Sequence, residues 1–340
     1  MTRKVCGFLK LPGHLIATPM KCSVKLALAL AAMAFAQQLP AQVPGPVAQL
    51  NQQDVRLAGI AERLLAANRA LCRQEMPLTG LVLHSRDQYR ASVAGAAFAN
   101  GPVAVAGVVP GSPAAAAAIG PGDGIAAIGS QPTATMTRIG EAPLRDTAFA
   151  ALAEQRPVII VVVRGGQERV LTLDAPSGCR ALVEIRAADS LDARSDGRVI
   201  QVNYGLAQDA TDEQLAVVFA HELGHLVLEH RRRLEAAGVE KGFFGEFGRN
   251  RRLNRQVEVE ADLISVHLLA NAGYDPAIAP AFWRSRLGRR AGGGILRSGT
   301  YPSAKARAEL VEREIAEHLA GRTGPSFPQH LMSRRDVPFD

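Results

Sequence analysis

The stretch FAHELGHLVLEH, residues 219–230, holds two histidines four residues apart, His221 and His225, with Glu222 directly after the first. Residues four apart lie on one face of a helix, so both imidazoles can reach one cation. Glu222 projects about 100° away, where it can contact a water on that cation without being a ligand. Composition alone predicts far fewer than one such match in 340 residues with eight histidines. The stretch therefore predicts a metal-binding helix rather than an ordinary amphipathic one.

The helix that carries this motif is expected to begin at Thr211, because Thr211 and Gln214 match the two halves of a capping box. It is expected to continue to about Arg233. His230 lies one turn beyond the motif, beside three arginines, and is expected to face solvent. The stretch GRVIQVNYG, residues 197–205, predicts a strand that leads into the helix and whose edge could hold an extended substrate.

The next predicted helix, RRLNRQVEVEADLISVHLLANAGYDP at residues 251–276, offers the third protein ligand that a zinc hydrolase needs. Glu258 and Asp262 are four residues apart and share a face, whereas Glu260 points elsewhere. Glu258 is therefore expected to bind the metal, and Asp262 to accept a hydrogen bond from a ligand histidine. The alternative is that these carboxylates form only a solvated helix face. His267 is too far along the helix to join them and is expected to be structural.

The sequences AHELGH and EVEADLISVHLLANAGYDP resemble the HtpX-type zinc metallopeptidases of metallopeptidase family 48. The pattern of that family is HExxH, followed by an ExxxAD-type helix that commonly ends in aGyDP. The resemblance covers roughly residues 180–320 and the helix before Cys72. It implies one Zn²⁺ per chain and these roles: metal ligands His221, His225 and Glu258, general base and acid Glu222, and hydrogen-bond acceptor Asp262.

The same resemblance implies a fold class and an activity. The fold is expected to be α+β, with a mainly helical zincin-type peptidase domain. The activity is expected to be that of a zinc metalloendopeptidase, which hydrolyses peptide bonds of protein substrates. Protein quality control in the cell envelope is the expected role, with possible peripheral association with membrane or envelope proteins.

A third motif of the family, a His-Pro pair with an arginine six residues after the histidine, appears here as GTYPSAKAR. Tyr301 stands in place of the histidine and Arg307 is retained. Both are expected to be catalytic, because a phenol and a guanidinium can donate hydrogen bonds to an oxyanion. The alternative is that Tyr301 only packs and that Arg307 pairs with a carboxylate.

Residues 77–176 have a different character, with short β-rich runs and many Gly and Ala. The stretch PGSPAAAAAIGPGDGI (110–125) predicts a short helix, a turn and a strand, and a second helix and a hairpin are expected by residue 173. This order resembles a bacterial PDZ domain, although residues 89–107 match it poorly. The resemblance implies capture of an extended peptide as an added strand. The alternative is an insert that binds nothing.

Residues 1–36 have the layout of a secretory signal peptide: a basic stretch, ten apolar residues and a small-x-small pattern. An exported, periplasmic protein is therefore expected; the alternative is an uncleaved membrane anchor. Cleavage would leave two cysteines, Cys72 and Cys179, which are expected to form a disulfide around the insert, the alternative being two free thiols. The other expected parts are a linker (37–53), a peptidase helix (54–76, helical over 54–71), the main peptidase segment (177–320) and a disordered tail (321–340).

The excess of positive charge falls mostly on this predicted signal peptide. The whole chain carries 39 basic and 32 acidic residues, and five of the basic ones lie in residues 1–36, which leaves 34 against 32. Such a balance gives no support to nucleic-acid binding. The competing function is a PDZ-based peptide-binding protein or chaperone with a latent or structural zinc site. A zinc amidase that acts on cell-wall peptides would share the chemistry and differ in substrate.

Overall fold

The computed structural model describes residues 45–239, 248–291 and 302–339. The predicted signal peptide and Tyr301 lie outside these ranges. Among the described helices, none combines the length and the apolar composition that crossing a membrane requires.

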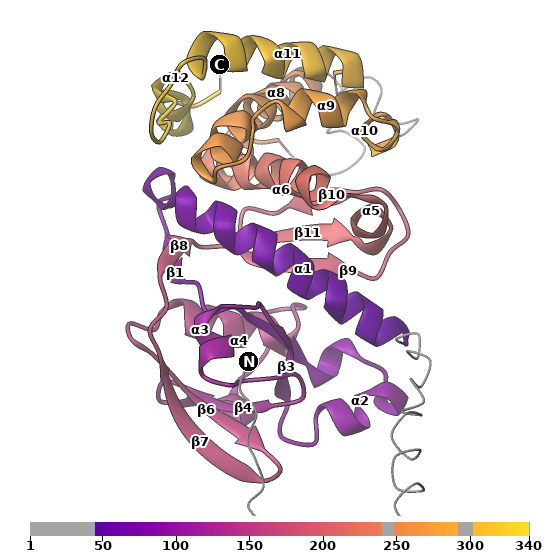
Figure 1. Cartoon of the computed structure of the whole chain (residues 1–340), viewed down its shortest axis with the longest axis vertical. Helices are drawn as coiled ribbons and strands as arrows, with labels where there is room; N and C mark the ends of the chain where they lie inside the picture. Colours follow the sequence, from indigo (N-terminus) through magenta and orange to yellow (C-terminus); the bar gives the residue numbers. More distant parts are fainter. Residues whose placement is uncertain (1–44, 240–247, 292–301, 340) are drawn as a thin grey trace, which may run out of the picture. The chain divides into compact units, whose positions relative to one another are not determined.

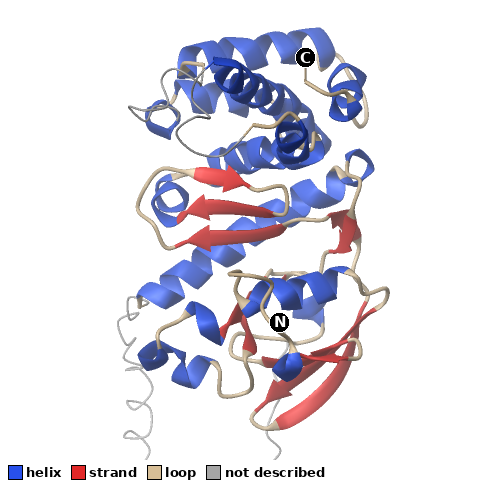
Figure 2. Cartoon of the chain, turned by 180° about the vertical axis from the view of Figure 1, so that it is seen from behind, coloured by secondary structure: helices blue, strands red, loops and turns tan. Residues whose placement is uncertain are grey.

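The main domain, residues 45–76 and 177–339, is built around a three-stranded sheet in the order β10-β11-β9. Strand β11 is antiparallel to β10 and parallel to β9. Helix α1 crosses one face of the sheet, and α6 lies beyond its β10 edge (Figures 1 and 2). These elements are α1 (Pro46–Ala67), β9 (Leu182–Arg186), β10 (Ala193–Ser195), β11 (Val199–Asn203), α5 (Tyr204–Asp209) and α6 (Asp212–Val227).

Helix α1 begins at Pro46, eight residues before the predicted start at Asp54. Gly45 has an extended backbone, and Pro46 is the first helical residue. Proline is favoured at this position because its fixed φ suits a helix and its missing N–H is not needed there. Four of the first eight residues of α1 are asparagine or glutamine, so apolar periodicity marks the helix clearly only from Asp54 onward. Residues 46–53, which were expected to belong to the linker, are therefore helical. The helix ends at Ala67, before the 3₁₀ turn η1 (Arg69–Leu71).

The predicted insert contains a six-stranded antiparallel sheet in the order β2-β3-β4-β6-β7, with β5 paired to β4. Ser112 caps the short helix α3 by accepting a hydrogen bond from the Ala115 N–H, as the sequence predicts. The elements are β2 (Leu81–Ser85), η2 (Arg86–Gln88), α2 (Ala91–Ala97), β3 (Val103–Val108), α3 (Pro113–Ala116), β4 (Gly124–Ile128), β5 (Gln131–Pro132), η3 (Thr133–Thr135), α4 (Leu144–Ala153), β6 (Val158–Arg164) and β7 (Gln167–Leu173).

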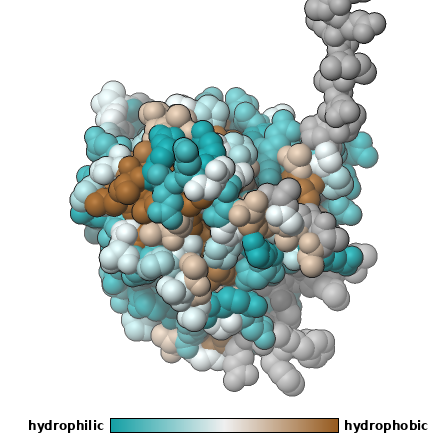
Figure 3. Space-filling view, turned by 90° about the horizontal axis from the view of Figure 1, so that it is seen from below, coloured by the Kyte–Doolittle hydropathy of each residue, from teal (hydrophilic) through white to brown (hydrophobic). Residues whose placement is uncertain are grey.

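The outer face of the β6–β7 hairpin is partly apolar. Val161 is paired with Val170, so Ile159 and Val170 point to the same face of the hairpin. Val170 is 72% exposed there, and Ile159 is 38% exposed. Seen from the end of the molecule that the insert forms, apolar residues lie in a group among hydrophilic ones (Figure 3).

The two ends of the insert leave the main domain at one point. Strand β1 (Glu75–Pro77) pairs with β8 (Ser177–Cys179) in an antiparallel ladder. Cys72 and Cys179 form the expected disulfide beside it, across a sequence separation of 107. One continuous core, including Leu64 of α1, Leu215 of α6 and Leu268 of α8, therefore joins chain segments from both sides of the insert.

The predicted helix from residue 211 to about 233 is interrupted. Thr211 and Gln214 make both halves of the capping box, but α6 ends at Val227. Glu229 then adopts a left-handed conformation with φ 51°, which redirects the chain into α7 (His230–Ala236). The break changes the direction in which His230 points.

From residue 204 onward the described elements are all helical, and the predicted disordered tail belongs to this part of the chain. Leu331 and Met332 are buried in the main core, and Phe339 packs with Leu253 and Val257. The prediction of disorder from residue 321 onward is therefore wrong: the composition is polar, but a few apolar side chains anchor the segment. The elements are α8 (Gly248–Asn271), α9 (Ile278–Arg284), α10 (Arg286–Ala291), α11 (Ala304–His318), α12 (Gln329–Met332) and η5 (Ser333–Asp336).

Candidate metal centre

Helices α6 and α8 approach closely because Gly224 has no side chain. A Cβ built at Gly224 would lie 2.7 Å from Cγ2 of Ile264 and 3.2 Å from the carbonyl oxygen of Ala261. Glycine at this point lets the backbone of one helix rest on the other. The close approach brings the histidines of α6 opposite the carboxylates of α8.

Three predicted ligands, His221, His225 and Glu258, meet at this contact. The Nε2 atoms of the two histidines are 3.2 Å apart. Glu258 places Oε2 3.2 Å from Nε2 of His221 and Oε1 3.5 Å from Nε2 of His225. Ligand atoms around a tetrahedral zinc ion, with bonds of 2.0–2.2 Å, lie roughly 3.3–3.5 Å apart. The donor set and its spacing therefore fit one zinc ion.

Asp262 lies behind His221, as the sequence predicts. Its Oδ1 is 3.0 Å from Nδ1 of His221, so it can accept the Nδ1–H and leave Nε2 free for a metal. Arg307 holds Asp262 in place by donating from Nε to Oδ2 at 2.6 Å and from Nη2 to Oδ1 at 2.5 Å. The guanidinium of Arg307 also lies 3.4 Å from the ring centroid of Trp283.

The position of Arg307 differs from the expected oxyanion role. Its guanidinium lies on the Nδ1 side of His221, away from the Nε2 atom that faces Glu258, and the residue is 4% exposed. The geometry therefore matches the alternative in which Arg307 pairs with a carboxylate. Tyr301, its expected partner in that motif, lies outside the described residues.

His230 is buried, contrary to the expectation that it faces solvent. Its Nδ1 lies 2.9 Å from Nδ1 of His225, and its Nε2 lies 3.1 Å from Oε2 of Glu260. Glu260 is fully buried and also accepts a hydrogen bond of 2.6 Å from Nη1 of Arg233. Helical spacing could not reveal this arrangement, because the break at Glu229 turns α7 back toward α8.

The charges of the centre suit cation binding. Burial raises the pKa of Glu222 to about 7, and the neighbouring Glu258 adds to the effect. Burial opposes ionisation of Glu258, but His225 and His221 hold its pKa at about 2. Burial lowers the pKa of His225 to about 3, which keeps that imidazole neutral. Burial also opposes a charge on His221, but Asp262 and Glu258 raise its pKa to about 10, and a metal at Nε2 would displace that proton.

The predicted strand before the motif helix is not an edge strand. Strand β11 has neighbours on both sides, so residues 197–205 cannot offer a free edge to a substrate. The outer strand nearest α6 is β10, which contacts that helix. Among the described strands of this sheet, β10 is therefore the edge strand next to α6.

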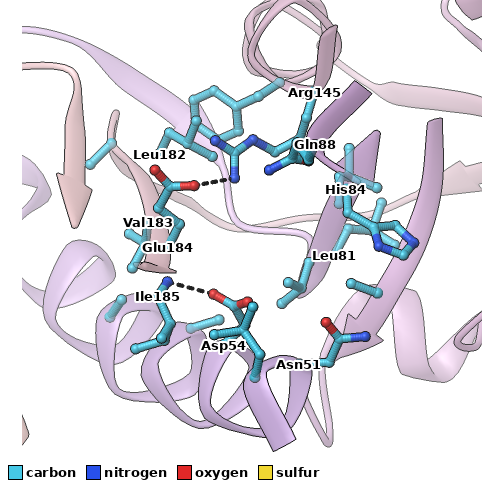
Figure 4. Close-up of a pocket in the computed structure, with 18 of the residues that line it drawn as sticks. Asn51, Asp54, Leu81, His84, Gln88, Arg145, Leu182, Val183, Glu184 and Ile185 are labelled. Carbon is cyan, nitrogen blue, oxygen red and sulfur yellow. Dashed lines mark hydrogen bonds and ion pairs between the residues drawn. The ribbon is translucent and has the colours of Figure 1, made fainter. Parts of the chain in front are cut away.

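A small cavity of about 110 Å³ lies where the insert meets the main domain, and none of the predicted metal ligands lines it. Figure 4 shows two polar interactions in its wall. Arg145 of α4 donates a hydrogen bond of 2.6 Å to Glu184 of β9, and Asp54 of α1 accepts one of 2.6 Å from the N–H of Ile185. These contacts join the insert, the sheet and α1.

Part of the chain is similar in sequence to known peptidases. Residues 183–248 match the model of Peptidase family M48. The chain is 31% identical, over 38% of its length, to the mitochondrial metalloendopeptidase OMA1 of Arabidopsis thaliana, and 27% identical, over 31%, to the protein of that name from Schizosaccharomyces pombe. The matches span 32% and 37% of those proteins, so the chain covers about a third of the length of these relatives.

Proposed function

We propose that this chain is a zinc-dependent metalloendopeptidase of the M48 type. The observation that carries the proposal is the convergence of His221, His225 and Glu258 at separations of 3.2–3.5 Å. The match to the M48 model and the similarity to two metalloendopeptidases support it. HtpX-type membership is the narrower form of the same proposal.

The roles of the residues follow from their positions. A bound zinc ion supplies Lewis-acid polarisation and a water whose pKa is lowered to about 7. Glu222 then takes the proton from the attacking water and passes it to the departing amine. A pKa of about 7 suits a group that must both accept and release a proton at neutral pH. Asp262 and Arg307 hold His221 in the orientation that directs Nε2 at the metal.

The substrate is proposed to be an unfolded or extended protein segment. Such a segment can pair with the outer edge of β10 and so pass beside α6. The PDZ-like insert is proposed to bind or gate the same substrates, and envelope quality control in the periplasm is the proposed setting. The disulfide between Cys72 and Cys179 supports an oxidising compartment.

The test is cleavage of an unfolded protein, such as reduced casein, by the full chain. We expect cleavage that a chelator abolishes and that added Zn²⁺ restores. Glu222→Gln is expected to lower kcat/KM by about 10²–10⁴-fold while the zinc content stays that of the wild type. Near-normal turnover of that variant would refute the role of Glu222. Chelator-insensitive protection of the substrate from aggregation, without cleavage, would instead support the peptide-binding or chaperone function.

A further inference from the structure

A second group of potential ligands lies at the other end of α8. His267 of α8 places Nε2 2.8 Å from Oε1 of Glu314 on α11. His330 of α12 places its Nε2 2.7 Å from the same oxygen. His267 and Glu314 are buried, whereas the side chain of His330 is 36% exposed. One ligand atom from each residue lies within 4.8 Å of the others, so the three side chains converge on one point.

The charge of Glu314 lacks a permanent cation. Among the ion pairs of the described residues, its partners are His267, His330 and, at 3.9 Å, His318. Glu314 is buried, and its described partners are imidazoles, with no lysine or arginine among them. Such an environment of a buried carboxylate favours a bound cation.

The chemistry of the group suits a transition metal. Two imidazoles and one carboxylate are the same donor set as in the first centre, and imidazole is a ligand that zinc prefers. Nδ1 of His267 lies 2.7 Å from the hydroxyl of Ser326, which can donate or accept a hydrogen bond. His267 can therefore carry its proton on Nδ1, donate it to Ser326 and present the Nε2 lone pair to a metal.

Metal binding requires the two contacts of Glu314 to widen. The two nitrogen–oxygen separations of 2.8 and 2.7 Å would have to grow to roughly 3.3–3.5 Å. His330 can move most easily, because it lies on a four-residue helix at the surface. His318 follows Glu314 by one turn, and its ring stacks on that of His330 with centroids 4.1 Å apart. His318 can supply a further ligand from the exposed side of the group.

We propose that His267, Glu314 and His330 form a second divalent transition-metal site, separate from the candidate catalytic centre. The metal would join α8, α11 and α12 and so fasten the C-terminal segment to the helix that carries Glu258. The same segment is already held by Asn271 of α8, which donates from Nδ2 to the carbonyl oxygen of Ser326 at 3.0 Å.

The first experiment counts zinc ions per chain. The full chain is stripped with a chelator, dialysed against Zn²⁺ and analysed by elemental mass spectrometry. We expect two zinc ions in the wild type, one in His330→Ala, one in His221→Ala and none in the double variant. Gln329→Ala changes an exposed neighbour of His330 and is expected to keep both. One zinc ion in the wild type, lost in His221→Ala and kept in His330→Ala, would overturn the proposal.

The second experiment measures stability and does not depend on activity. Zinc added to apo His221→Ala is expected to raise Tm by several degrees, because a ligand that binds only the folded state stabilises it. The rise should disappear in His221→Ala combined with Glu314→Gln, which retains the shape of the side chain. An equal rise in both variants, or no rise in either, contradicts the site. Neither result bears on proteolysis, since a chain with one zinc ion at the first centre would remain a candidate peptidase.

Discussion

Nδ1 of His230 lies 2.9 Å from Nδ1 of His225, so this candidate metal ligand is oriented by another histidine rather than by a carboxylate directly. Glu260 completes the chain of contacts, 3.1 Å from Nε2 of His230. If His230 donates from Nε2 to Glu260, its Nδ1 can accept the Nδ1–H of His225 and leave Nε2 of His225 free for the metal.

Replacing His230 should therefore weaken zinc binding at the first centre. We expect His230→Ala to lower zinc affinity by about 10–100-fold, because the ring of His225 loses the contact that fixes its tautomer. His230→Asn offers a smaller acceptor at a similar position and is expected to retain more of the affinity. The measurement is competition with a chromophoric chelator. Unchanged affinity in both variants would show that His230 has only a packing role.

Gly224→Ala should separate α6 and α8, the two helices that carry the candidate metal ligands. The new Cβ would lie 2.7 Å from a side-chain atom of Ile264 and against the backbone of Ala261, so the free energy of unfolding should fall by about 1–3 kcal/mol. Zinc affinity should fall with it. The matched control is Gly59→Ala in α1, where the nearest atom is 3.6 Å away. That variant should be neutral or stabilised by up to about 1 kcal/mol. Denaturant unfolding of the apo and zinc-loaded chains tests both variants. Equal changes in the free energy of unfolding for Gly224→Ala and Gly59→Ala would contradict the prediction.

Asp54 should make stability depend on pH. Burial raises its pKa from 3.8 to about 7, against the lowering effect of the hydrogen bond from Ile185. The folded state thus holds this proton more tightly than the unfolded chain, and its contribution is complete below about pH 4 and lost as the pH rises through 7. Because of Asp54, the free energy of unfolding falls by at most about 4 kcal/mol over this pH range.

Asp54→Asn keeps the acceptor oxygen and removes the titration. Its Tm relative to the wild type should therefore rise between pH 5 and pH 8. The exposed Asp174→Asn provides the control, in which the relative Tm should stay flat. A flat difference for Asp54→Asn as well would mean that this carboxyl is ionised in the folded state throughout.

The disulfide should stabilise the main domain by restricting the unfolded chain. Replacing both Cys72 and Cys179 with alanine should lower the free energy of unfolding by about 2–4 kcal/mol, because the bond closes a loop across a separation of 107 residues. Thermal unfolding of the wild type with and without reductant gives the same comparison without a substitution. Identical Tm values, with mass analysis confirming reduction, would contradict the expected contribution.

Local patterns were enough to predict the start of α6 and of α3, and that His221 and His225 share one face of a helix. The capping box at Thr211, the helix cap at Ser112 and the spacing of His221 and His225 depend on neighbours within four residues. These are interactions that the sequence displays directly. The burial of His221 follows once α6 packs against α8.

Features that depend on tertiary contact were missed. The break at Glu229 leaves no mark in the apolar pattern, and without it His230 points to solvent. The sequence of the C-terminal tail is mostly polar, Pro and Gly residues, yet Leu331 is fully buried. The cluster of His267, Glu314 and His330 joins residues up to 63 positions apart, and no spacing rule predicts it.

The insertion point between Cys72 and Cys179 has a consequence for the order of synthesis. Helix α1 leaves the ribosome first, but its sheet partner β9 and its helical partner α6 follow more than a hundred residues later. At 5–20 residues per second, the apolar face that includes Leu57 and Leu64 waits on the order of ten seconds for its partners. The intervening segment can therefore complete its own sheet before the apolar face of α1 finds the partners that cover it.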